Sequence, residues 1–265
     1  MSEHAQSAQL QEIAHRLADI ARVETLKLFR SPGLSTDNKD QAGGFDPVTA
    51  ADRRTEEEMR KVLSEHRPQD GVIGEEFGVV PGESDFTWVL DPIDGTRAFI
   101  SGTASWGVLI SVERDGYPIF GMIDQPYLQE RFVGGCGNAD LLTKSGKRRL
   151  STRRCNSLKD ATLLTTFPEI GTLAERARFE RVRDNVRLTR YGLDCYGYAL
   201  LALGQVDMVI EAGLSHYDIS APIAVVEAAG GIVTNWQGDP VKEGGQVVAA
   251  GDRRVHTQAL ELLNA

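Results

Sequence analysis

Apolar residues recur at helical spacing in two segments near the N-terminus. In the first segment they lie three or four residues apart, at Leu10, Ile13, Leu17 and Ile20. This period predicts an amphipathic helix over residues 5–29, and the same spacing predicts a second helix over residues 52–66. Residues 31–45 between them lack the period and contain glycine and proline, so we expect a loop with Lys39 in its middle.

From residue 71 onward the pattern changes to short apolar runs bounded by turn residues. These runs predict β-strands at residues 71–74, 86–90, 107–114, 117–123 and 129–134. The dipeptide Asp115-Gly116 between two of these strands is typical of a tight hairpin. The first half of the chain is therefore expected to form a partly antiparallel sheet with helices.

The second half of the chain alternates between strand-like and helix-like segments. Strands are predicted at residues 162–166, 206–211, 231–235 and 246–250, and helices at residues 172–185, 194–203, 218–229 and 253–263. This alternation favours an α/β layer. Because a polar, basic segment over residues 143–154 precedes it, we divide the chain into an N-terminal α+β domain, residues 1–145, and a C-terminal α/β domain, residues 146–265.

The amino-acid composition argues against several kinds of binding partner and metal site. The formal net charge of −9 argues against nucleic acid and anionic membranes, which attract basic surfaces. No apolar run approaches the roughly 20 residues that a membrane-spanning helix needs. The three cysteines are far apart and form no Cys-x-x-Cys pair, so we expect a reduced, cytoplasmic protein. The five histidines do not cluster, which argues against a zinc site.

The segment from residue 88 to residue 96 combines an apolar strand with acidic and turn residues. Asp91 and Asp94 flank Pro92, whose φ is held near about −65°, so the strand is expected to break and turn both carboxylates toward one place. A helix beginning at Thr96 would direct its free N–H groups toward an anion beside the aspartates. The same residue types also occur in ordinary surface turns.

Three other acidic segments lie at predicted element boundaries, where α/β proteins gather their sites. They are Gly74-Glu75-Glu76, residues 46–52 ending in Asp52, and Ser215-His216-Tyr217-Asp218. Several carboxylates in one pocket need cations to offset their repulsion. Because oxygen ligands suit hard cations, the pattern predicts a magnesium or manganese site that binds a phosphate group.

Three motifs occur together in this order: Gly74-Glu75-Glu76, Asp91-Pro92-Ile93-Asp94-Gly95-Thr96, and Tyr217-Asp218 followed by Glu227-Ala228-Ala229-Gly230-Gly231. Their order and spacing resemble the inositol monophosphatase superfamily of magnesium-dependent, lithium-sensitive phosphatases, over almost the whole chain. The resemblance implies a layered αβαβα sandwich of the α+β class. It also implies a small phosphorylated substrate and a homodimer.

The resemblance further implies a set of metal ligands. Glu75, Asp91 and the backbone carbonyl of Ile93 would hold one Mg²⁺ ion. Asp91 would also bridge to a second ion, held with Asp94 and Asp218. A third, weaker ion would share Glu75, so two or three ions are expected in total.

Catalytic roles are implied for Asp52, Glu75 and Thr96, with Thr96 and Asp52 acting together on the attacking water. The N–H groups of Gly95 and Thr96, with Asp94 beside them, would hold the substrate phosphate. Simpler roles stay open for four residues. Asp52 and Asp218 can each cap the helix that follows them. Glu76 can be either a solvated residue or a neighbour that supports the ligands without binding metal, and Lys39 can be a solubilising loop residue that never closes over the site.

Substrate choice depends on two further segments, residues 97–102 and 191–202. Both resemble the histidinol-phosphate phosphatase branch of the superfamily. Inositol phosphatases usually have a small residue in place of Asp194 and a tryptophan in place of Tyr217. Asp194, together with Glu211, would attract an amino cation and an imidazole more strongly than a neutral polyol. Alternatively Asp194 is a helix N-cap, and Tyr196 and Tyr198 belong either to the core or to the pocket rim.

The leading hypothesis is a magnesium-dependent histidinol-phosphate phosphatase, which releases L-histidinol and phosphate in histidine biosynthesis. The alternatives within the superfamily are hydrolysis of inositol-1-phosphate, a sugar phosphate or adenosine 3′,5′-bisphosphate. A non-catalytic binding protein is a further alternative from a different class. It is disfavoured because every matched position, including Asp94, Thr96 and Asp218, retains a chemically competent side chain.

Overall fold

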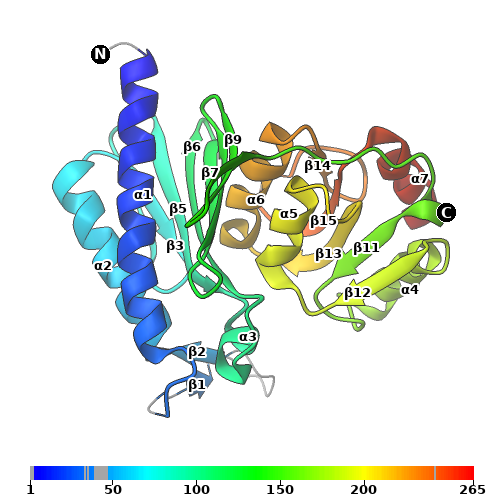
Figure 1. Cartoon of the computed structure of the whole chain (residues 1–265), viewed down its shortest axis with the longest axis horizontal. Helices are drawn as coiled ribbons and strands as arrows, with labels where there is room; N and C mark the ends of the chain where they lie inside the picture. Colours follow the sequence, from blue (N-terminus) through cyan, green and yellow to red (C-terminus); the bar gives the residue numbers. More distant parts are fainter. Residues whose placement is uncertain (1–2, 33, 35, 39–46, 242) are drawn as a thin grey trace.

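Two β-sheets alternate with three layers of helices in this protein. The computed structural model describes residues 3–265 except residues 33, 35, 39–46 and 242. Across the molecule lie helices α1 and α2, a large sheet, helices α5 and α6, a smaller sheet, and helices α4 and α7 (Figure 1). This order confirms the predicted αβαβα sandwich. Lys39 lies outside the described residues.

The large sheet has eight strands in the order β10-β9-β8-β7-β6-β5-β3-β4. Its neighbours are antiparallel except for β3 and β5, which are parallel. The predicted hairpin at Asp115-Gly116 joins β6 to β7, and both of its residues have positive φ. The strands are β3 (Gly71–Gly74), β4 (Gly78–Val80), β5 (Phe86–Asp94), β6 (Gly107–Arg114), β7 (Tyr117–Gln125), β8 (Glu130–Gly135), β9 (Asn138–Thr143) and β10 (Gly146–Arg149).

Helices α1 (Glu3–Leu28) and α2 (Ala50–His66) cover the outer face of this sheet (Figure 1). Their predicted apolar positions are buried against it, among them Leu10, Leu17 and Met59. A two-stranded ribbon, β1 (Thr36–Asn38) and β2 (Pro47–Thr49), lies where only a loop was expected. The short helix α3 (Thr96–Ser101) begins at the residue proposed from the sequence.

The smaller sheet has five strands in the order β12-β11-β13-β15-β14. Helices α5 and α6 separate it from the large sheet, and α4 and α7 cover its far side (Figure 1). Its strands are β11 (Thr162–Thr165), β12 (Leu188–Tyr191), β13 (Met208–Leu214), β14 (Ile232–Thr234) and β15 (Gly245–Ala250). The helices of this half are η1 (Leu158–Asp160), α4 (Leu173–Arg183), α5 (Asp194–Ala202), α6 (His216–Ala228) and α7 (Arg253–Leu263).

Helix α6 is enclosed on all sides, because it lies between the two sheets. Residues 219–226 are all buried, and the segment has no polar face, as expected for a helix at the centre of a layered fold. One apolar cluster joins α5 and α6 to the large sheet through Leu109, Ile123 and Phe132. The proposed domain division at residues 145 and 146 falls in the turn between the paired strands β9 and β10, and it stays a proposal.

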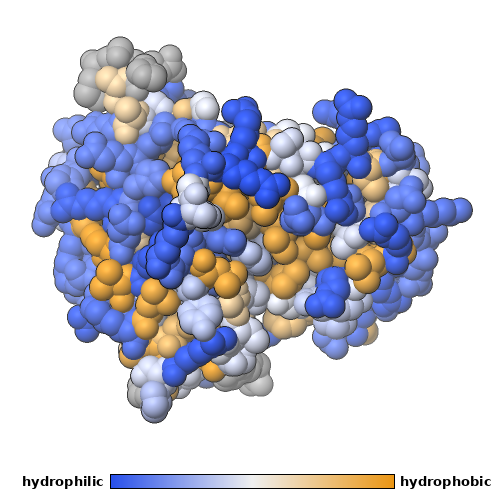
Figure 2. All heavy atoms as spheres, viewed as in Figure 1, coloured by the Kyte–Doolittle hydropathy of each residue, from blue (hydrophilic) through white to orange (hydrophobic). Residues whose placement is uncertain are grey.

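Figure 2 shows a largely hydrophilic face, with apolar side chains gathered in a band across its middle. Within the part of the chain that the structure describes, no helix combines the length and the apolar character needed to cross a bilayer.

Candidate active site

Strand β5 carries Asp91 and Asp94, and it does not break at Pro92 as the sequence predicted. Asp91 lies opposite Leu109 and Asp94 opposite Gly107, so three residue steps on β5 match two on β6. In a regular strand, residues three apart face opposite sides. The extra residue forms a bulge that brings both carboxylates to the same side. The prediction of a break is corrected to a bulge, while the predicted convergence is observed.

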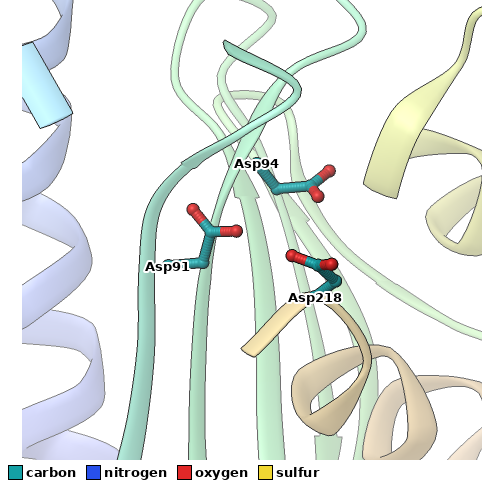
Figure 3. A group of neighbouring side chains, drawn as sticks. All are labelled: Asp91, Asp94 and Asp218. Carbon is teal, nitrogen blue, oxygen red and sulfur yellow. The ribbon is translucent and has the colours of Figure 1, made fainter. Parts of the chain in front are cut away.

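Asp218 joins these two aspartates from the first turn of α6. Carboxylate oxygens of Asp91, Asp94 and Asp218 all lie within 4.8 Å of one another, and Figure 3 shows the three side chains converging. Asp218 is not the helix cap, because Ser215 occupies that position. The Ser215 N–H instead donates to Asp218 Oδ2 at 2.7 Å, which orients the carboxylate.

Burial and mutual repulsion make this cluster unfavourable as free anions. Burial raises the pKa of Asp91 well above its usual value, and the charges of Glu75, Asp94 and Asp218 raise it further. Burial also raises the pKa of Asp94, with Asp218 and Asp194 adding to the effect. Divalent cations relieve such repulsion, and carboxylate and carbonyl oxygens are the donors that hard cations prefer. The donor set therefore fits the metal site expected from the sequence.

Glu75 lies in the turn after β3, and a residue not anticipated from the sequence holds this turn. Glu56 of α2 is fully buried and accepts hydrogen bonds from the N–H groups of Glu76 at 2.7 Å and Phe77 at 3.3 Å. A Cβ atom on Gly74 would lie 2.0 Å from Glu56 Oε1, so a larger residue there would displace the Glu56 carboxylate from these hydrogen bonds. The one sequence signal for Glu56 is its spacing of one helical turn after Asp52.

Glu76 is not a solvated side chain, which was one of the two simpler roles open to it. Its side chain is only 2% exposed, and a carboxylate oxygen lies 4.0 Å from Arg53 Nε. The Glu76 N–H is bonded to Glu56. Glu76 is therefore a buried neighbour of Glu75, within the turn that α2 holds in place.

The structure brings Thr96 next to Asp52, a residue 44 positions earlier. The Thr96 hydroxyl lies 3.5 Å from Asp52 Oδ1 and 3.2 Å from the carbonyl oxygen of Ile93. Thr49 is the cap of α2, and Asp52 Oδ2 accepts from its N–H at 2.9 Å and its hydroxyl at 2.5 Å. Asp52 thus completes a capping box while its other oxygen faces Thr96. Burial raises its pKa to about 6, against the hydrogen bonds from Thr49.

A cavity of about 370 Å³ opens beside the carboxylates, and every residue proposed to contact substrate lines it. These residues are Asp94, Gly95, Thr96, Asp194 and Glu211. Gly95 has φ of 83°, and a Cβ atom there would lie 2.8 Å from Asp194 Cγ. The start of α3 and the start of α5 therefore meet closely at this wall of the cavity.

Asp194 is the first residue of α5, in the left-handed region with φ of 44°. Leu193 is the cap, so the alternative that Asp194 caps this helix is wrong. Asp194 Oδ2 accepts from the Ser105 hydroxyl at 2.7 Å. Burial raises the pKa of Asp194, against the effects of Ser105 and Arg97. The next N–H along the chain, that of Cys195, donates to Asp94 Oδ2 at 2.7 Å.

Glu211 of β13 forms the deeper acidic wall of the cavity. Its carboxylate accepts from the Thr165 hydroxyl at 3.1 Å and from the N–H and hydroxyl of Thr166 at 2.6 and 2.9 Å. Burial raises its pKa to about 7, against these hydrogen bonds. Tyr198 also lines the cavity, whereas the Tyr196 hydroxyl donates to Glu130 Oε2 at 2.6 Å.

Known proteins share both the sequence and the fold of this chain. The sequence profile of the inositol monophosphatase family matches residues 6–265. The bifunctional phosphatase IMPL2 of Arabidopsis thaliana chloroplasts is 42% identical over 262 residues, which cover 95% of this chain and 74% of that protein. A histidinol-phosphatase of Mycobacterium tuberculosis is 37% identical over 262 residues, covering 96% of this chain and 97% of that protein.

A solved structure of an inositol monophosphatase from Zymomonas mobilis is also similar. It is 40% identical, superposes with a TM-score of 0.86, and each chain is covered over 100% of its length. Sequence and structure therefore lead to the same conclusion. This chain belongs to the inositol monophosphatase family of metal-dependent phosphatases, which act on small phosphorylated substrates.

Proposed function

We propose that this phosphatase hydrolyses L-histidinol phosphate with bound Mg²⁺ ions, releasing L-histidinol and phosphate in histidine biosynthesis. The observation that carries the proposal is the half-buried carboxylate of Asp194 on the cavity wall, which it shares with Asp94 and Glu211. An acidic wall suits a substrate that carries an ammonium group. The relatives named as histidinol-phosphatases support the same substrate.

The metal ligands are part of this proposal. Glu75, Asp91 and the carbonyl of Ile93 would hold one ion, and Asp91, Asp94 and Asp218 a second, with a third ion sharing Glu75. When bound, Mg²⁺ supplies positive charge that offsets the carboxylates, orients the phosphate and lowers the pKa of the attacking water. Convergence of the three aspartates within 4.8 Å supports this assignment.

The remaining chemistry belongs to the chain's own residues. The Thr96 hydroxyl contacts Asp52 Oδ1, so it can accept a proton from the attacking water and pass its own proton to Asp52. The N–H groups of Gly95 and Thr96 would hold phosphate oxygens, because they lie at the start of α3, where N–H groups have no partner within the helix. Thr96 is kept in position by its second contact, to the carbonyl of Ile93.

Asp194 and Glu211 would share the recognition of the alcohol part of the substrate. Three hydrogen bonds from Thr165 and Thr166 occupy the Glu211 carboxylate. Among the described residues, the Asp194 carboxylate accepts one hydrogen bond, from Ser105, and retains acceptor capacity for a ligand. Asp194 is therefore the residue that we expect to contact the ammonium group.

Inositol-1-phosphate is the second candidate substrate. The Zymomonas mobilis structure, 40% identical over the whole chain, is that of an inositol monophosphatase. Glu211 would serve a polyol as well as an amino alcohol, because a carboxylate accepts hydrogen bonds from either. The two candidates therefore differ in the contribution of Asp194.

The test is phosphate release with Mg²⁺ from histidinol phosphate, inositol-1-phosphate, fructose-1,6-bisphosphate and adenosine 3′,5′-bisphosphate. We expect kcat/KM for histidinol phosphate to exceed the others about 100-fold, or about 2.7 kcal/mol. Asp194→Asn, which keeps the shape and removes the charge, should lower that preference about tenfold or more. A flat or inositol-led profile in the unmodified protein would overturn the substrate and leave the metal chemistry in place.

The homodimer implied by the resemblance and the cytoplasmic location expected from the cysteine pattern belong to the same proposal. Sedimentation equilibrium of the purified chain measures the first directly. A mass equal to one chain, 29.0 kDa, would overturn the dimer.

A further inference from the structure

The hydroxyl of Tyr198 is a buried polar group that points to an unassigned contact. Its side chain is 3% exposed, and among the described residues its hydroxyl oxygen has no hydrogen-bond partner. Buried hydroxyls are nearly always hydrogen-bonded, because an unpaired one destabilises the fold. Since Tyr198 lines the active-site cavity, a bound molecule can supply the missing partner.

The position of Tyr198 places it beside the proposed recognition residue. It follows Asp194 by four residues on α5, so the two side chains lie on one face of the helix, a single turn apart. Asp94, Asp194, Glu211 and Asp218 line the same cavity and accept hydrogen bonds. Burial and the charges of Glu211 and Asp94 raise the pKa of Tyr198, which keeps its proton on the oxygen. Tyr198 therefore offers a hydrogen-bond donor on a cavity wall whose carboxylates accept hydrogen bonds.

We infer that Tyr198 is a specificity-determining residue whose hydroxyl donates a hydrogen bond to a neutral acceptor on the alcohol side of the phosphate ester. The inference rests on the proposed function, in which that acceptor is the unprotonated ring nitrogen of an imidazole. In their ionised form, Asp194 and Glu211 can bind the ammonium group and the ring N–H but not this nitrogen, because an ionised carboxylate only accepts hydrogen bonds. Tyr198 supplies a hydrogen-bond donor whether or not these two acids are ionised.

The test compares Tyr198→Phe with the unmodified protein on two esters, histidinol phosphate and phenyl phosphate. The second has no acceptor on its alcohol side. We expect kcat/KM for histidinol phosphate to fall about tenfold or more, while that for phenyl phosphate changes less than about twofold. Because the removed hydroxyl has no partner among the described residues, the midpoint of thermal unfolding should stay the same or rise.

Tyr196→Phe is the matched control. Tyr196 lies on the same helix, but its hydroxyl donates to Glu130 and it is absent from the cavity lining. Its removal should lower the unfolding midpoint, because Glu130 loses a partner, and should leave the ratio of the two kcat/KM values unchanged. The two variants therefore distinguish an effect on substrate recognition from an effect on the stability of the fold.

Each outcome decides a specific claim. If the unmodified protein prefers histidinol phosphate and Tyr198→Phe keeps that preference, the Tyr198 inference is wrong and the proposed substrate stands. If the protein prefers inositol-1-phosphate, the proposed substrate is wrong; the Tyr198 inference then holds if Tyr198→Phe lowers kcat/KM for that ester about tenfold or more while changing that for phenyl phosphate less than about twofold, and it is overturned if both values change equally. A protein that prefers no polar ester over phenyl phosphate would overturn both.

Discussion

At the scale of single residues, backbone N–H groups orient the three aspartates of the candidate metal site. Asp91, Asp94 and Asp218 accept hydrogen bonds from the N–H groups of Ile93, Cys195 and Ser215, at 3.0, 2.7 and 2.7 Å. Such outer contacts fix ligand geometry before an ion binds. Burial, together with the mutual repulsion of the carboxylates, raises the pKa of Asp91 and Asp94.

The substitution Asp218→Asn removes the charge of this side chain but keeps the hydrogen bond that orients it. The amide oxygen can still accept from Ser215, while one repelling charge is removed. We expect the metal-free variant to unfold at a higher temperature than the unmodified protein, to lose the stabilisation by Mg²⁺, and to lose about 100-fold or more in phosphate release. Thermal unfolding with and without Mg²⁺, together with a phosphate assay, measures all three.

Asp252→Asn is the control for that prediction. Asp252 caps α7, outside the cavity lining, and asparagine caps helices equally well. The shift of its unfolding temperature on addition of Mg²⁺ should equal that of the unmodified protein. Full activity in Asp218→Asn would contradict the assignment of Asp218 as a metal ligand.

At the scale of elements, the starts of α3 and α5 meet where Gly95 faces Asp194. Gly95→Ala adds a methyl group 2.8 Å from Asp194 Cγ, at a φ of 83° that L-residues rarely adopt. We expect the variant to lose activity about tenfold or more, because helix α3 carries Thr96 and must move away from the cavity wall. Strain at the positive φ alone destabilises by about 1–2 kcal/mol.

Gly116→Ala isolates that backbone strain. Gly116 has φ of 72° in the β6–β7 hairpin, and a Cβ atom there has nothing within 4 Å. Its stability loss, measured by urea unfolding, should resemble the strain part of Gly95→Ala, with full activity. Equal activities in the two variants would show that the close approach of Gly95 and Asp194 is unimportant for catalysis.

At the scale of the whole molecule, buried histidines in the two outer helical layers couple stability to pH. Burial lowers the pKa of His15 on α1 and of His256 on α7 below the ordinary 6.5. The unfolded chain then binds protons more readily, so stability is complete above about pH 6.5 and falls as the pH drops below it. Buried acids with raised pKa values, such as Glu211, act in the opposite direction.

The substitution His256→Gln measures how much His256 contributes to the pH dependence of the free energy of unfolding. Between about pH 7.5 and about pH 5.5, the unmodified protein should lose more free energy of unfolding than the variant does. Urea unfolding at the two pH values gives both changes. His66→Gln, at a side chain that is 39% exposed, is the control and should follow the unmodified protein. The same change in all three proteins would contradict the prediction.

Exposure separates most strands that the sequence revealed from those that it missed, although the largely buried strand β9 was missed as well. Strands β5 and β6 are buried along nearly their whole length, and their apolar runs predicted them. Strands β4, β10 and β12 lie at sheet edges and are largely exposed, so they have no hydrophobic pattern to detect. They form because a neighbouring strand offers hydrogen bonds, and the one-dimensional pattern does not contain that neighbour.

At the candidate active site, too, the sequence could single out only residues with a local signal. Asp91, Asp94 and Asp218 could be singled out because carboxylates at element ends are a local signal. Glu56 could not, since its partners are backbone N–H groups 20 and 21 residues later. Tyr198 could be placed in either the core or the rim, because the cavity that decides between them is formed by several distant segments.

The sequence by itself determined the properties that depend on neighbours along the chain. These are the helical periods, the hairpin at Asp115-Gly116 and the motifs that identify the family. Only the tertiary structure decided that a bulge turns Asp91 and Asp94 to one side, that Thr96 meets Asp52, and that burial raises the pKa values of the acids. The physical reason is that these properties depend on distances between remote segments and on the exclusion of water, which exist only once the layers have packed.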